Sequence, residues 1–415
     1  MKLNIAVGAQ WGDEGKGKIN LHLAQGADIC MRCGGGSNAE CSVYHEGKEF
    51  HFRMLPAGMV RGRIGLIGDG VLIRCDRLMK DVQALEAHFG DLSDRLIISG
   101  NAHVVMPDHV RLDGRNNDTG KTETIREGVG PAVADRAHRI GVTVDQFIAA
   151  DGELAHYEPW EDRATYVALL KKYRGNIKEY LARVRNSDVT VMIQGSQALM
   201  LDAIHGVYPA VTSTNTTTTG MLYGAGLPYS AVTRNIGICK AFPTRFDDNG
   251  PLPTEIPSPE QERIRGLANE FCHVPIKALR VGYQDLVALR YSHQINDYSE
   301  LCLNKIDVMT GLDRIPICVG YERDGRVFDA FYDWHTIADR PVTPVYEYLP
   351  GWTEDIRGAH KVYCTAAKRP ELHFLHRGDR RRTDTDHRHR SCRPRNDRAL
   401  AGGSRCRCRC CCPSA

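Results

Sequence analysis

A glycine-rich run near the N-terminus constrains this chain more than any other feature. It reads Gly8-Ala9-Gln10-Trp11-Gly12-Asp13-Glu14-Gly15-Lys16-Gly17-Lys18, and is called the cradle below. The apolar residues 3–7 before it predict a buried strand, and the apolar positions in 19–24 predict a helix after it. Glycines let main-chain N–H groups turn toward a ligand, and a lysine at a helix N-terminus adds positive charge. The run therefore predicts an anion site, with Lys16 or Lys18 as its cation.

The cradle departs from the strict phosphate-loop pattern, in which Gly-Lys is followed by a Ser or Thr that holds Mg²⁺. Gly17 stands at that position, so Asp13 could supply a metal ligand instead. The alternative interpretation is an ordinary glycine-rich turn whose charged side chains are solvated. On this stretch alone both interpretations stay open.

The composition is that of a large globular protein, because 42% of the 415 residues are hydrophobic and 25% are charged. Such a chain can bury a substantial core in one large domain with smaller appendages. No apolar run approaches the roughly 20 residues that a membrane helix requires, and the N-terminus enters the first strand without a signal-peptide pattern. We therefore expect a cytoplasmic protein that does not bind membranes.

Strand and helix signals alternate after the cradle. Residues 27–32 and parts of 48–73 predict strands, Cys75–Phe89 has helical spacing, and the β-branched run 189–193 predicts a central strand. The expected fold class is α/β, with a large, mostly parallel central sheet flanked by helices, similar to P-loop NTPases, and with smaller appended helical and β segments. A helical region is also expected over 145–184.

Polar segments at the ends of these strands are candidate ligand-binding loops. They are the glycine-rich loop 33–42, the turn 194–197 and the threonine-rich run 208–219, whose alternative interpretation is a solvated edge or turn. Residues 97–98 and 104–105 predict a short strand pair. The polar segment 113–130 predicts a loop that can order over a ligand.

A further strand signal leads into Asn304-Lys305-Ile306-Asp307, a motif of the kind that reads guanine. The Asp307 carboxylate would accept hydrogen bonds from the guanine ring N–H and amine, and the Lys305 stem would cover the ring. By itself a strand that ends in Lys and Asp is common. The interpretation of this motif as guanine-reading is therefore supported only in combination with the cradle.

The combination resembles the adenylosuccinate synthetase family over residues 1 to about 367. The segments that carry the resemblance occur in the family's order: the cradle, 35–39, 128–132, 206–213, 269–271, 304–307 and 348–352. The resemblance implies a homodimeric ligase of purine nucleotide metabolism that uses GTP and Mg²⁺ to join L-aspartate to IMP. In this chemistry the 6-oxygen of IMP attacks the γ-phosphate of GTP, and the aspartate amine then displaces phosphate from the 6-phosphoryl intermediate.

The same resemblance implies residue roles. Asp13 would be the general base and a metal ligand, Lys16 the phosphate cation, and Cys41 stands where the family has a catalytic histidine. The implied GTP contacts are Gly12, Asp13, Glu14, Gly15, Lys16, Gly17, Lys18, Glu40, Cys41, Ser42, Lys305, Ile306 and Asp307. The implied IMP contacts are Asn38, Ala39, Arg139, Gln197, Thr212 and Lys277, with Arg139 reaching a neighbouring subunit. The implied metal ligands are Asp13 and Glu40.

Three departures from the family fall at functional positions. Glu40-Cys41-Ser42 replaces Gly-His-Thr, which puts a weakly donating thiol in place of the histidine. Residues 272–281 keep only Lys277 and Arg280 where an arginine-rich aspartate loop is expected. After Arg369 nothing offers the family's closing strand and loop over guanine.

The segment 368–415 is an aberrant tail, rich in Arg and Cys from Arg377 onward. Three interpretations of this tail compete: a disordered basic arm that binds nucleic acid, a metal-binding cysteine cluster, and the product of out-of-frame translation. We favour the last, because the part of the tail from Arg377 onward lacks lysine and the tail replaces a segment that the fold requires, so a nucleic-acid partner is not expected. Nine of the 15 cysteines lie upstream without metal-site spacing and are expected to be reduced thiols: Cys30, Cys33, Cys41, Cys75, Cys239, Cys272, Cys302, Cys318 and Cys364.

Two alternatives to the ligase follow from these departures. One is a diverged enzyme of the same fold that uses another amine donor or another purine nucleotide. The other is a catalytically impaired protein that still binds guanine nucleotide. An RNA-binding protein that works through its tail is a third, weaker hypothesis.

Overall fold

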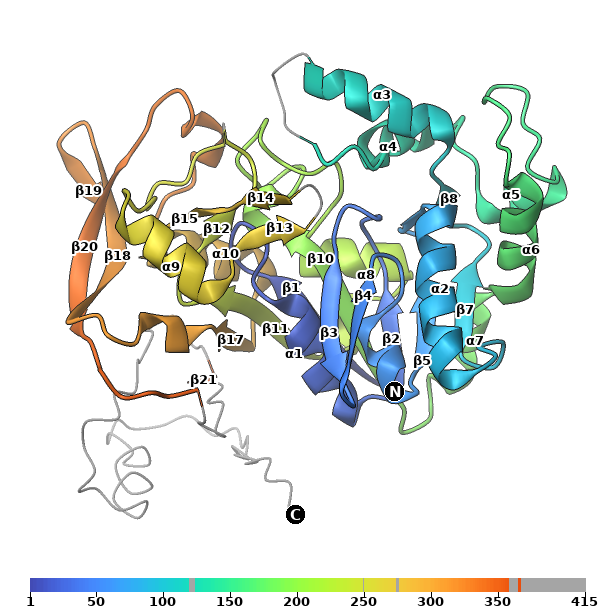
Figure 1. The fold of residues 1–415 in the computed structure, drawn as a ribbon, viewed down its shortest axis with the longest axis horizontal. Coiled ribbons are helices and arrows are strands. Elements are labelled where there is room, and N and C mark those ends of the chain that lie inside the picture. The colour runs from blue at the N-terminus through green and yellow to red at the C-terminus, as the bar shows by residue number, and fades with distance from the viewer. Residues whose placement is uncertain (119–123, 249, 274–275, 358–364, 367–415) are drawn as a thin grey trace, which may run out of the picture. The chain divides into compact units, whose positions relative to one another are not determined.

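The computed structural model describes residues 1–118, 124–248, 250–273, 276–357 and 365–366 (Figure 1). All elements below belong to one unit, Met1–Glu371. The tail predicted from residue 368, and the domain boundary placed there, lie outside the described residues.

A nine-stranded sheet runs through this unit, in the order β21-β17-β11-β1-β10-β2-β5-β7-β9. All neighbouring pairs are parallel except β17 and β21. The strands are β1 (Lys2–Gly8), β2 (Ile29–Arg32), β5 (Ile64–Ile67), β7 (Leu96–Ser99), β9 (Arg174–Gly175), β10 (Thr190–Ala198), β11 (Val232–Lys240), β17 (Glu300–Asn304) and β21 (Thr365–Ala366). The predicted α/β class with a mostly parallel sheet is confirmed.

The centre of the sheet is covered on both faces. Successive residues of β1 and of β10 are buried, although their side chains point alternately to opposite faces. Helices α1 (Lys16–Leu23) and α8 (Thr218–Ala225) both pack against these two strands. The central strand predicted over 189–193 is confirmed as the start of β10.

The other helices surround the sheet and the smaller sheets. They are α2 (Cys75–Phe89), α3 (Pro107–Asp118), α4 (Val129–His138), α5 (Val144–Ala149), α6 (Arg163–Tyr173), α7 (Ile177–Val184), α9 (Glu260–Ala268) and α10 (Leu286–Asn296). The helical region expected over 145–184 is therefore three helices, with β9 between the last two. Within the described residues, none of the helices has the length and apolarity to cross a membrane.

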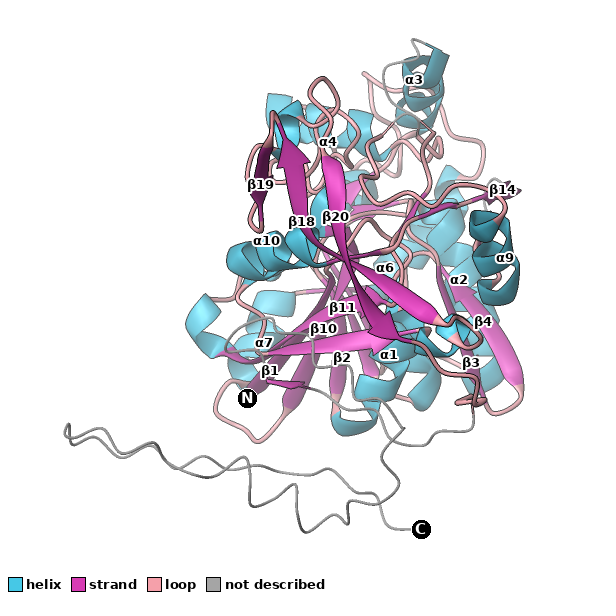
Figure 2. Cartoon of the chain, turned by 90° about the vertical axis from the view of Figure 1, so that its left-hand side faces the viewer, coloured by secondary structure: helices cyan, strands magenta, loops and turns pink. Residues whose placement is uncertain are grey.

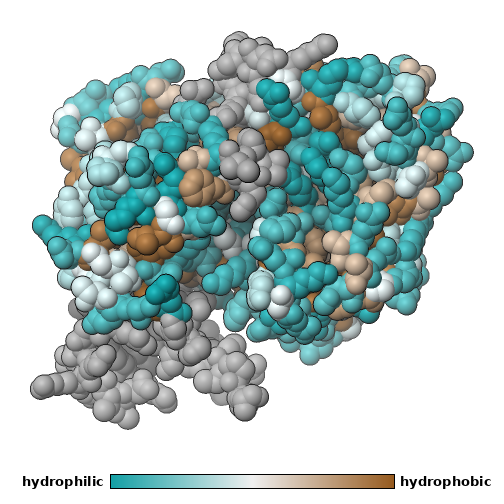
Figure 3. Space-filling view, in the orientation of Figure 1, coloured by the Kyte–Doolittle hydropathy of each residue, from teal (hydrophilic) through white to brown (hydrophobic). Residues whose placement is uncertain are grey.

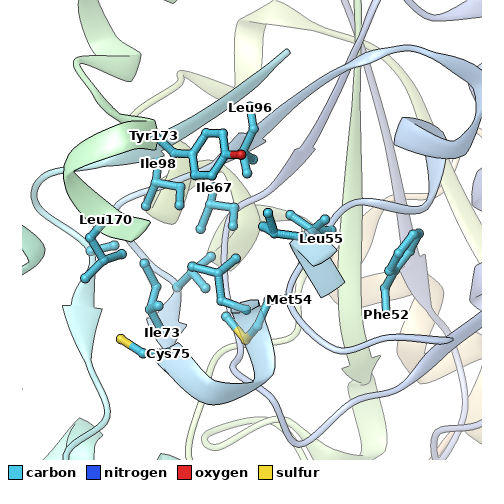
Figure 4. Packing of buried hydrophobic residues seen from close by; sticks show 14 of the residues in the cluster. Phe52, Met54, Leu55, Ile67, Ile73, Cys75, Leu96, Ile98, Leu170 and Tyr173 are labelled. Atoms are coloured by element: carbon cyan, nitrogen blue, oxygen red, sulfur yellow. The ribbon is translucent and has the colours of Figure 1, made fainter. Parts of the chain in front are cut away.

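A large hydrophobic cluster joins α2 and α6 to the β5–β7 side of the sheet. Figure 4 shows Ile67, Leu96 and Ile98 of the strands packed beside Leu170 and Tyr173 of α6. The helical face predicted for α2 contributes Leu78, Val82 and Leu85 to this cluster. Burying each such side chain contributes about 1.5–3 kcal/mol, so this cluster holds one side of the sheet firmly.

A second, smaller sheet lies beside the main one and accounts for the appended β segments (Figure 2). It contains β16 (Gln284–Asp285), β18 (Arg314–Arg323), β19 (Arg326–Phe328) and β20 (Thr343–Pro350). Its core includes Trp334, whose ring lies 6.3 Å from that of Trp11 in an edge-to-face arrangement. The cradle is thus packed against this second sheet.

Short strand pairs complete the described structure. They are β3 (Cys41–His45) with β4 (Lys48–Phe52), β6 (Leu72–Ile73) with β8 (His103–Val104), β12 (Thr244–Arg245) with β15 (Arg280–Val281), and β13 (Phe271–His273) with β14 (Ile276–Ala278). The face seen in Figure 3 is mostly hydrophilic with scattered apolar patches. Eight of the nine upstream cysteines lie in the described residues, and the seven whose side chains are described are buried free thiols.

Three local predictions are wrong. Residues 97–98 and 104–105 lie on strands β7 and β8, but these do not pair with each other, because β7 joins β5 and β9 whereas β8 joins β6. Residues 113–118 are helical rather than loop, since α3 extends through them. The turn predicted at 194–197 is the continuation of β10, although Gln197 has a left-handed φ of 51°.

Candidate active site

The cradle connects the C-terminal end of β1 to the start of α1 and is shaped by one buried carboxylate. Glu14 is fully buried, and its Oε1 accepts hydrogen bonds from the main-chain N–H of Gln10 (3.2 Å) and of Gly12 (2.9 Å). Gly12 (φ 101°) and Gly15 (φ 78°) have left-handed backbones, which glycine adopts without a steric cost. Glu14 therefore acts as the internal support of the loop.

Lys16, the predicted phosphate cation, lies against this support. Its Nζ is 2.5 Å from Oε2 of Glu14, and its side chain is only 14% exposed. Lys18, two residues further along α1, is exposed. The cradle thus holds one lysine in an ion pair and presents the other to solvent.

Asp13 is the carboxylate that the cradle presents. It is exposed to solvent and has a left-handed φ of 55°, a conformation that costs free energy in a residue other than glycine. Many protein atoms nevertheless surround it, and the resulting desolvation raises its pKa, opposed by the charges of Lys240 and Lys16. Its exposure to water moderates this rise. A strained, accessible carboxylate between cations is suited to accept a proton or to bind a metal ion.

The Asn304–Asp307 motif meets the cradle because β17 lies two strands from β1. Asn304 Nδ2 donates to the Glu14 carbonyl oxygen at 2.7 Å. Lys305 follows with a left-handed φ of 56°, and its Nζ lies 2.6 Å from Oε1 of Glu270 and 2.9 Å from the Ala268 carbonyl oxygen. The predicted base-reading motif is therefore tied directly to the predicted phosphate loop.

Lys240 is a buried cation that the sequence analysis missed. It ends β11, is 0% exposed, and donates through Nζ to Thr244 Oγ1 (2.7 Å) and Glu270 Oε1 (2.9 Å). Burial lowers its pKa, opposed by the charges of Glu270 and Asp13. The sequence signal that could have identified Lys240 is a lysine at the end of an apolar strand.

Three predicted nucleotide contacts, Asn38, Gln197 and Thr212, lie close to the glycine-rich loop. Asn38 Nδ2 donates to Thr212 Oγ1 at 3.4 Å, and a Cβ built on Gly35 would lie 3.5 Å from Oε1 of Gln197. The Asn38 Oδ1 and both amide atoms of Gln197 are buried and have no hydrogen-bond partner within the described part of the chain. Buried amides without partners are costly, which points to a polar ligand that satisfies them.

Cys41 lies behind the cradle. It is 8% exposed, belongs to the same hydrophobic cluster as Phe50 and Phe52, and its sulfur would lie 2.9 Å from a Cβ built on Gly17. Burial raises the pKa of the thiol to about 11, so it is neutral at physiological pH. The thiol thus packs against the loop backbone.

Glu40, the other predicted metal ligand, contacts polar and positively charged groups. Its Oε1 lies 3.1 Å from Ser42 Oγ and 3.2 Å from His51 Nδ1, and its Oε2 lies 3.6 Å from a guanidinium nitrogen of Arg53. Among the described residues no group of three or more His, Cys, Asp or Glu side chains is arranged to hold a metal ion. A metal at this site would need ligands from a bound substrate.

The remaining predicted contacts differ in their surroundings. Arg139 is exposed just after α4 with a left-handed φ of 66°. Lys277 Nζ lies 3.0 Å from an Asp248 carboxylate oxygen and 4.8 Å from the Phe246 ring centroid. Ala39 sits beside Asn38, and Ile306 opens the short 3₁₀ helix after Lys305.

A buried ion cluster beside Ser37 was also missed. Glu127 accepts from Ser37 Oγ (2.7 Å) and pairs with Arg53 (3.2 Å), Arg74 (3.0 Å) and Arg77 (2.9 Å). The cluster fixes the base of the loop that carries Asn38. Its residues come from four separate segments, so no local pattern could reveal it.

Comparison with known proteins agrees with this geometry. A family model described as adenylosuccinate synthetase matches residues 5–367. The structure of fully ligated adenylosuccinate synthetase from Plasmodium falciparum is similar with a TM-score of 0.76 and 29% identity, over 86% of this chain and 89% of that one. The succinoaminodeoxyadenylate synthetase of cyanophage S-2L, bound to dGMP and to dATP as an energy donor, shares the fold with a TM-score of 0.59 and 21% identity, over 73% of this chain and 84% of that one.

Proposed function

Since the chain belongs to the adenylosuccinate synthetase family of carbon–nitrogen ligases, which join IMP and aspartate in purine biosynthesis, we propose that it uses GTP to form adenylosuccinate, GDP and phosphate. The observation that carries the proposal is Asp13, an accessible carboxylate in a left-handed turn of a main-chain cradle. In the family's chemistry a carboxylate must remove a proton from the purine beside the triphosphate. Asp13 is suited to that role.

The proposed reaction has two steps. Asp13 accepts the N1 proton of IMP while the purine 6-oxygen attacks the γ-phosphorus, and the bond from that phosphorus to the bridging oxygen of GDP breaks. The aspartate amine then attacks C6, and the 6-oxygen leaves with the phosphoryl group as phosphate. Main-chain N–H groups of the cradle and the Lys16 ammonium stabilise the charge that builds on the transferring group.

The nucleotide sites follow from the surrounding contacts. The unpartnered amides of Asn38 and Gln197, together with Thr212, are proposed to bind IMP, since a polar ligand would satisfy them. Lys305 and Asp307 are proposed to read the guanine of GTP. They follow Asn304, whose side chain contacts the cradle, by one and three residues. The other predicted contacts of the cradle and of Glu40 to Ser42 belong to the same proposal.

Magnesium fits the donor set at Asp13. Mg²⁺ is commonly bound by one or two carboxylates together with substrate phosphates, so a single accessible carboxylate next to the cradle is sufficient. Asp13 would hold the ion, with Glu40 as the second predicted ligand. When bound, the ion would neutralise phosphate charge.

A homodimer is part of the proposal. Arg139 is exposed in a left-handed turn at the end of α4, where its side chain is available to a second subunit. The resemblance places this arginine on the nucleotide phosphate of a neighbouring subunit. Each site would then be complete only in the dimer.

The test is a coupled assay of the purified chain with IMP, GTP and aspartate, in which GDP and adenylosuccinate are both measured. Equal amounts of the two products are expected, and Asp13→Asn should abolish both while leaving the thermal unfolding midpoint near that of the unchanged chain. GDP release without a ligated product would contradict the proposal. So would full activity of Asp13→Asn.

A second candidate, a different amine donor, is favoured by one observation. Lys277 lies 3.0 Å from Asp248, and Arg280 pairs with Glu255 at its guanidinium, so both remaining cations of the aspartate segment already contact carboxylates. An amine donor with two carboxylates, such as aspartate, would have to displace the Asp248 and Glu255 carboxylates from these cations. Supplying other amino acids in the same assay distinguishes the two donors, because only the diverged enzyme would turn over one of them faster than aspartate.

A further inference from the structure

One carboxylate oxygen connects two lysines that belong to different parts of the site. Glu270, 4% exposed, follows α9, and its Oε1 lies 2.9 Å from Lys240 Nζ and 2.6 Å from Lys305 Nζ. Two ammonium groups share this acceptor, so a change in one contact alters the other. Glu270 lies outside both the Asn304–Asp307 motif and the cradle.

On one side the connection reaches the cradle. Lys240 is fully buried, and its backbone N–H donates to Gln10 Oε1 at 2.9 Å, while the Gln10 N–H donates to the Glu14 carboxylate that supports the loop. Gln284 Nε2 donates to the Lys240 carbonyl oxygen at 3.1 Å and so fixes the same strand end.

On the other side the connection reaches the base-reading motif. The Lys305 side chain is 34% exposed, so its stem is accessible while its ammonium is held by Glu270 and the Ala268 carbonyl oxygen. Its left-handed backbone adds strain that neighbouring contacts must hold. The position of the Lys305 stem therefore depends on Glu270.

We propose that Glu270 is a positioning residue that couples recognition of the purine base at Lys305 to the phosphate cradle through Lys240. The proposal deepens the proposed function and rests on it for the identity of the base. When a base packs on the Lys305 stem, Glu270 supplies the charged acceptor that holds the Lys305 ammonium, together with the Ala268 carbonyl oxygen. The same oxygen accepts a hydrogen bond from the Lys240 ammonium, and the Lys240 main chain is bonded to Gln10 of the cradle.

The experiment uses the full chain and compares GDP with ADP by titration calorimetry. Glu270→Gln should lower the affinity for GDP about tenfold with a smaller effect on ADP, because a charged hydrogen-bond acceptor of the base-reading lysine is lost. Glu262→Gln is the matched control, since Glu262 is exposed on α9 and contacts Ser258. It should leave both affinities unchanged.

A purely structural role predicts a different result. If Glu270 only held the fold together, GDP and ADP would lose affinity by the same factor, and Glu270→Gln would weaken GDP equally in the Lys305→Met background. The coupling instead predicts that Lys305→Met removes most of the base preference by itself and that adding Glu270→Gln changes it little. At saturating GTP, Glu270→Gln should also lower kcat about tenfold through the loss of the Lys240 contact.

The outcomes separate the inference from the proposed function. If the unsubstituted chain showed no preference for GDP over ADP, the proposal that the site reads guanine would be wrong. The inference would then lose its premise. A clear preference that survives in Glu270→Gln, or an unchanged kcat in that variant, would overturn the inference alone. If Glu270→Gln does not fold, Glu270→Asp keeps the charge on a shorter side chain, and the same loss of preference is expected from it.

Discussion

The Nζ of Lys16 lies 2.5 Å from Oε2 of Glu14, so the cation of the cradle is paired with the carboxylate that supports the loop. Binding of a phosphate at the cradle would offer this ammonium a second, more strongly charged partner. Because Glu14 is fully buried, Lys16 also compensates a carboxylate that water cannot reach. The two residues therefore have separable effects on catalysis and on stability.

Replacing Lys16 by Met should lower kcat by about 10² to 10³, since one cation that stabilises the transferring phosphoryl group is lost. The measurement is steady-state turnover at saturating substrates. Lys80→Met, at an exposed position of α2, is the control for the loss of one lysine. A Lys16→Met enzyme as fast as this control would contradict the role.

Replacing Glu14 by Ala should lower the free energy of unfolding by about 2–4 kcal/mol, because the N–H groups of Gln10 and Gly12 lose their buried acceptor and Lys16 loses its partner. Urea unfolding measures the change. Glu161→Ala, at an exposed acidic position, should change the free energy of unfolding by only a few tenths of a kcal/mol. Equal effects of the two substitutions would show that Glu14 does not support the loop.

The parts of the fold that the sequence predicts are those set by local pattern. The bounds of α2 follow from helical spacing at Leu78, Val82 and Leu85, all of which the structure buries. The central position of β10 follows from its β-branched run, which suits a strand covered on both faces. The cradle could be predicted from the sequence because its strand, glycine run and helix follow one another directly along the chain.

The parts that escaped prediction depend on contacts between distant segments. Strands β7 and β8 are adjacent in sequence, but they belong to different sheets, because β7 pairs in the central sheet and β8 pairs with β6. Lys240 and Glu270 acquire their importance only because β11 and the end of α9 meet beside the cradle. A buried charge is identified by its partners, and these are not contained in any one stretch of sequence.

The Cys41 thiol should make stability depend on pH in the alkaline range. Burial raises its pKa from 9.0 to about 11, so the folded state holds the proton more tightly than the unfolded state. This contribution, about 3 kcal/mol for a shift of this size, is fully present below pH 9 and is lost as pH rises through about 11.

Urea unfolding of the unchanged chain and of Cys41→Ala at pH 8 and above pH 10 measures this contribution. The substitution removes one buried thiol and keeps the other cysteines, so the unchanged chain should lose more stability with pH than the variant does. Parallel losses in both proteins would show that the thiol is not buried behind Gly17. Turnover should change little, since a neutral thiol packed on the loop backbone transfers no proton at pH 7.

Replacing Gln197 by Ala should affect nucleotide binding and the free energy of unfolding differently. Its amide atoms are buried without partners in the described residues, so Gln197→Ala removes polar groups whose burial without a hydrogen bond costs free energy. The unfolding free energy should therefore stay unchanged or rise slightly, even though β10 lies at the centre of the sheet. The KM for IMP should rise about tenfold or more, because two hydrogen-bonding atoms that we propose to bind the nucleotide are lost. Gln25→Ala, at an exposed position, should change neither quantity. A Gln197→Ala protein that is markedly less stable but has an unchanged KM for IMP would show that this amide supports the strand and does not bind the nucleotide.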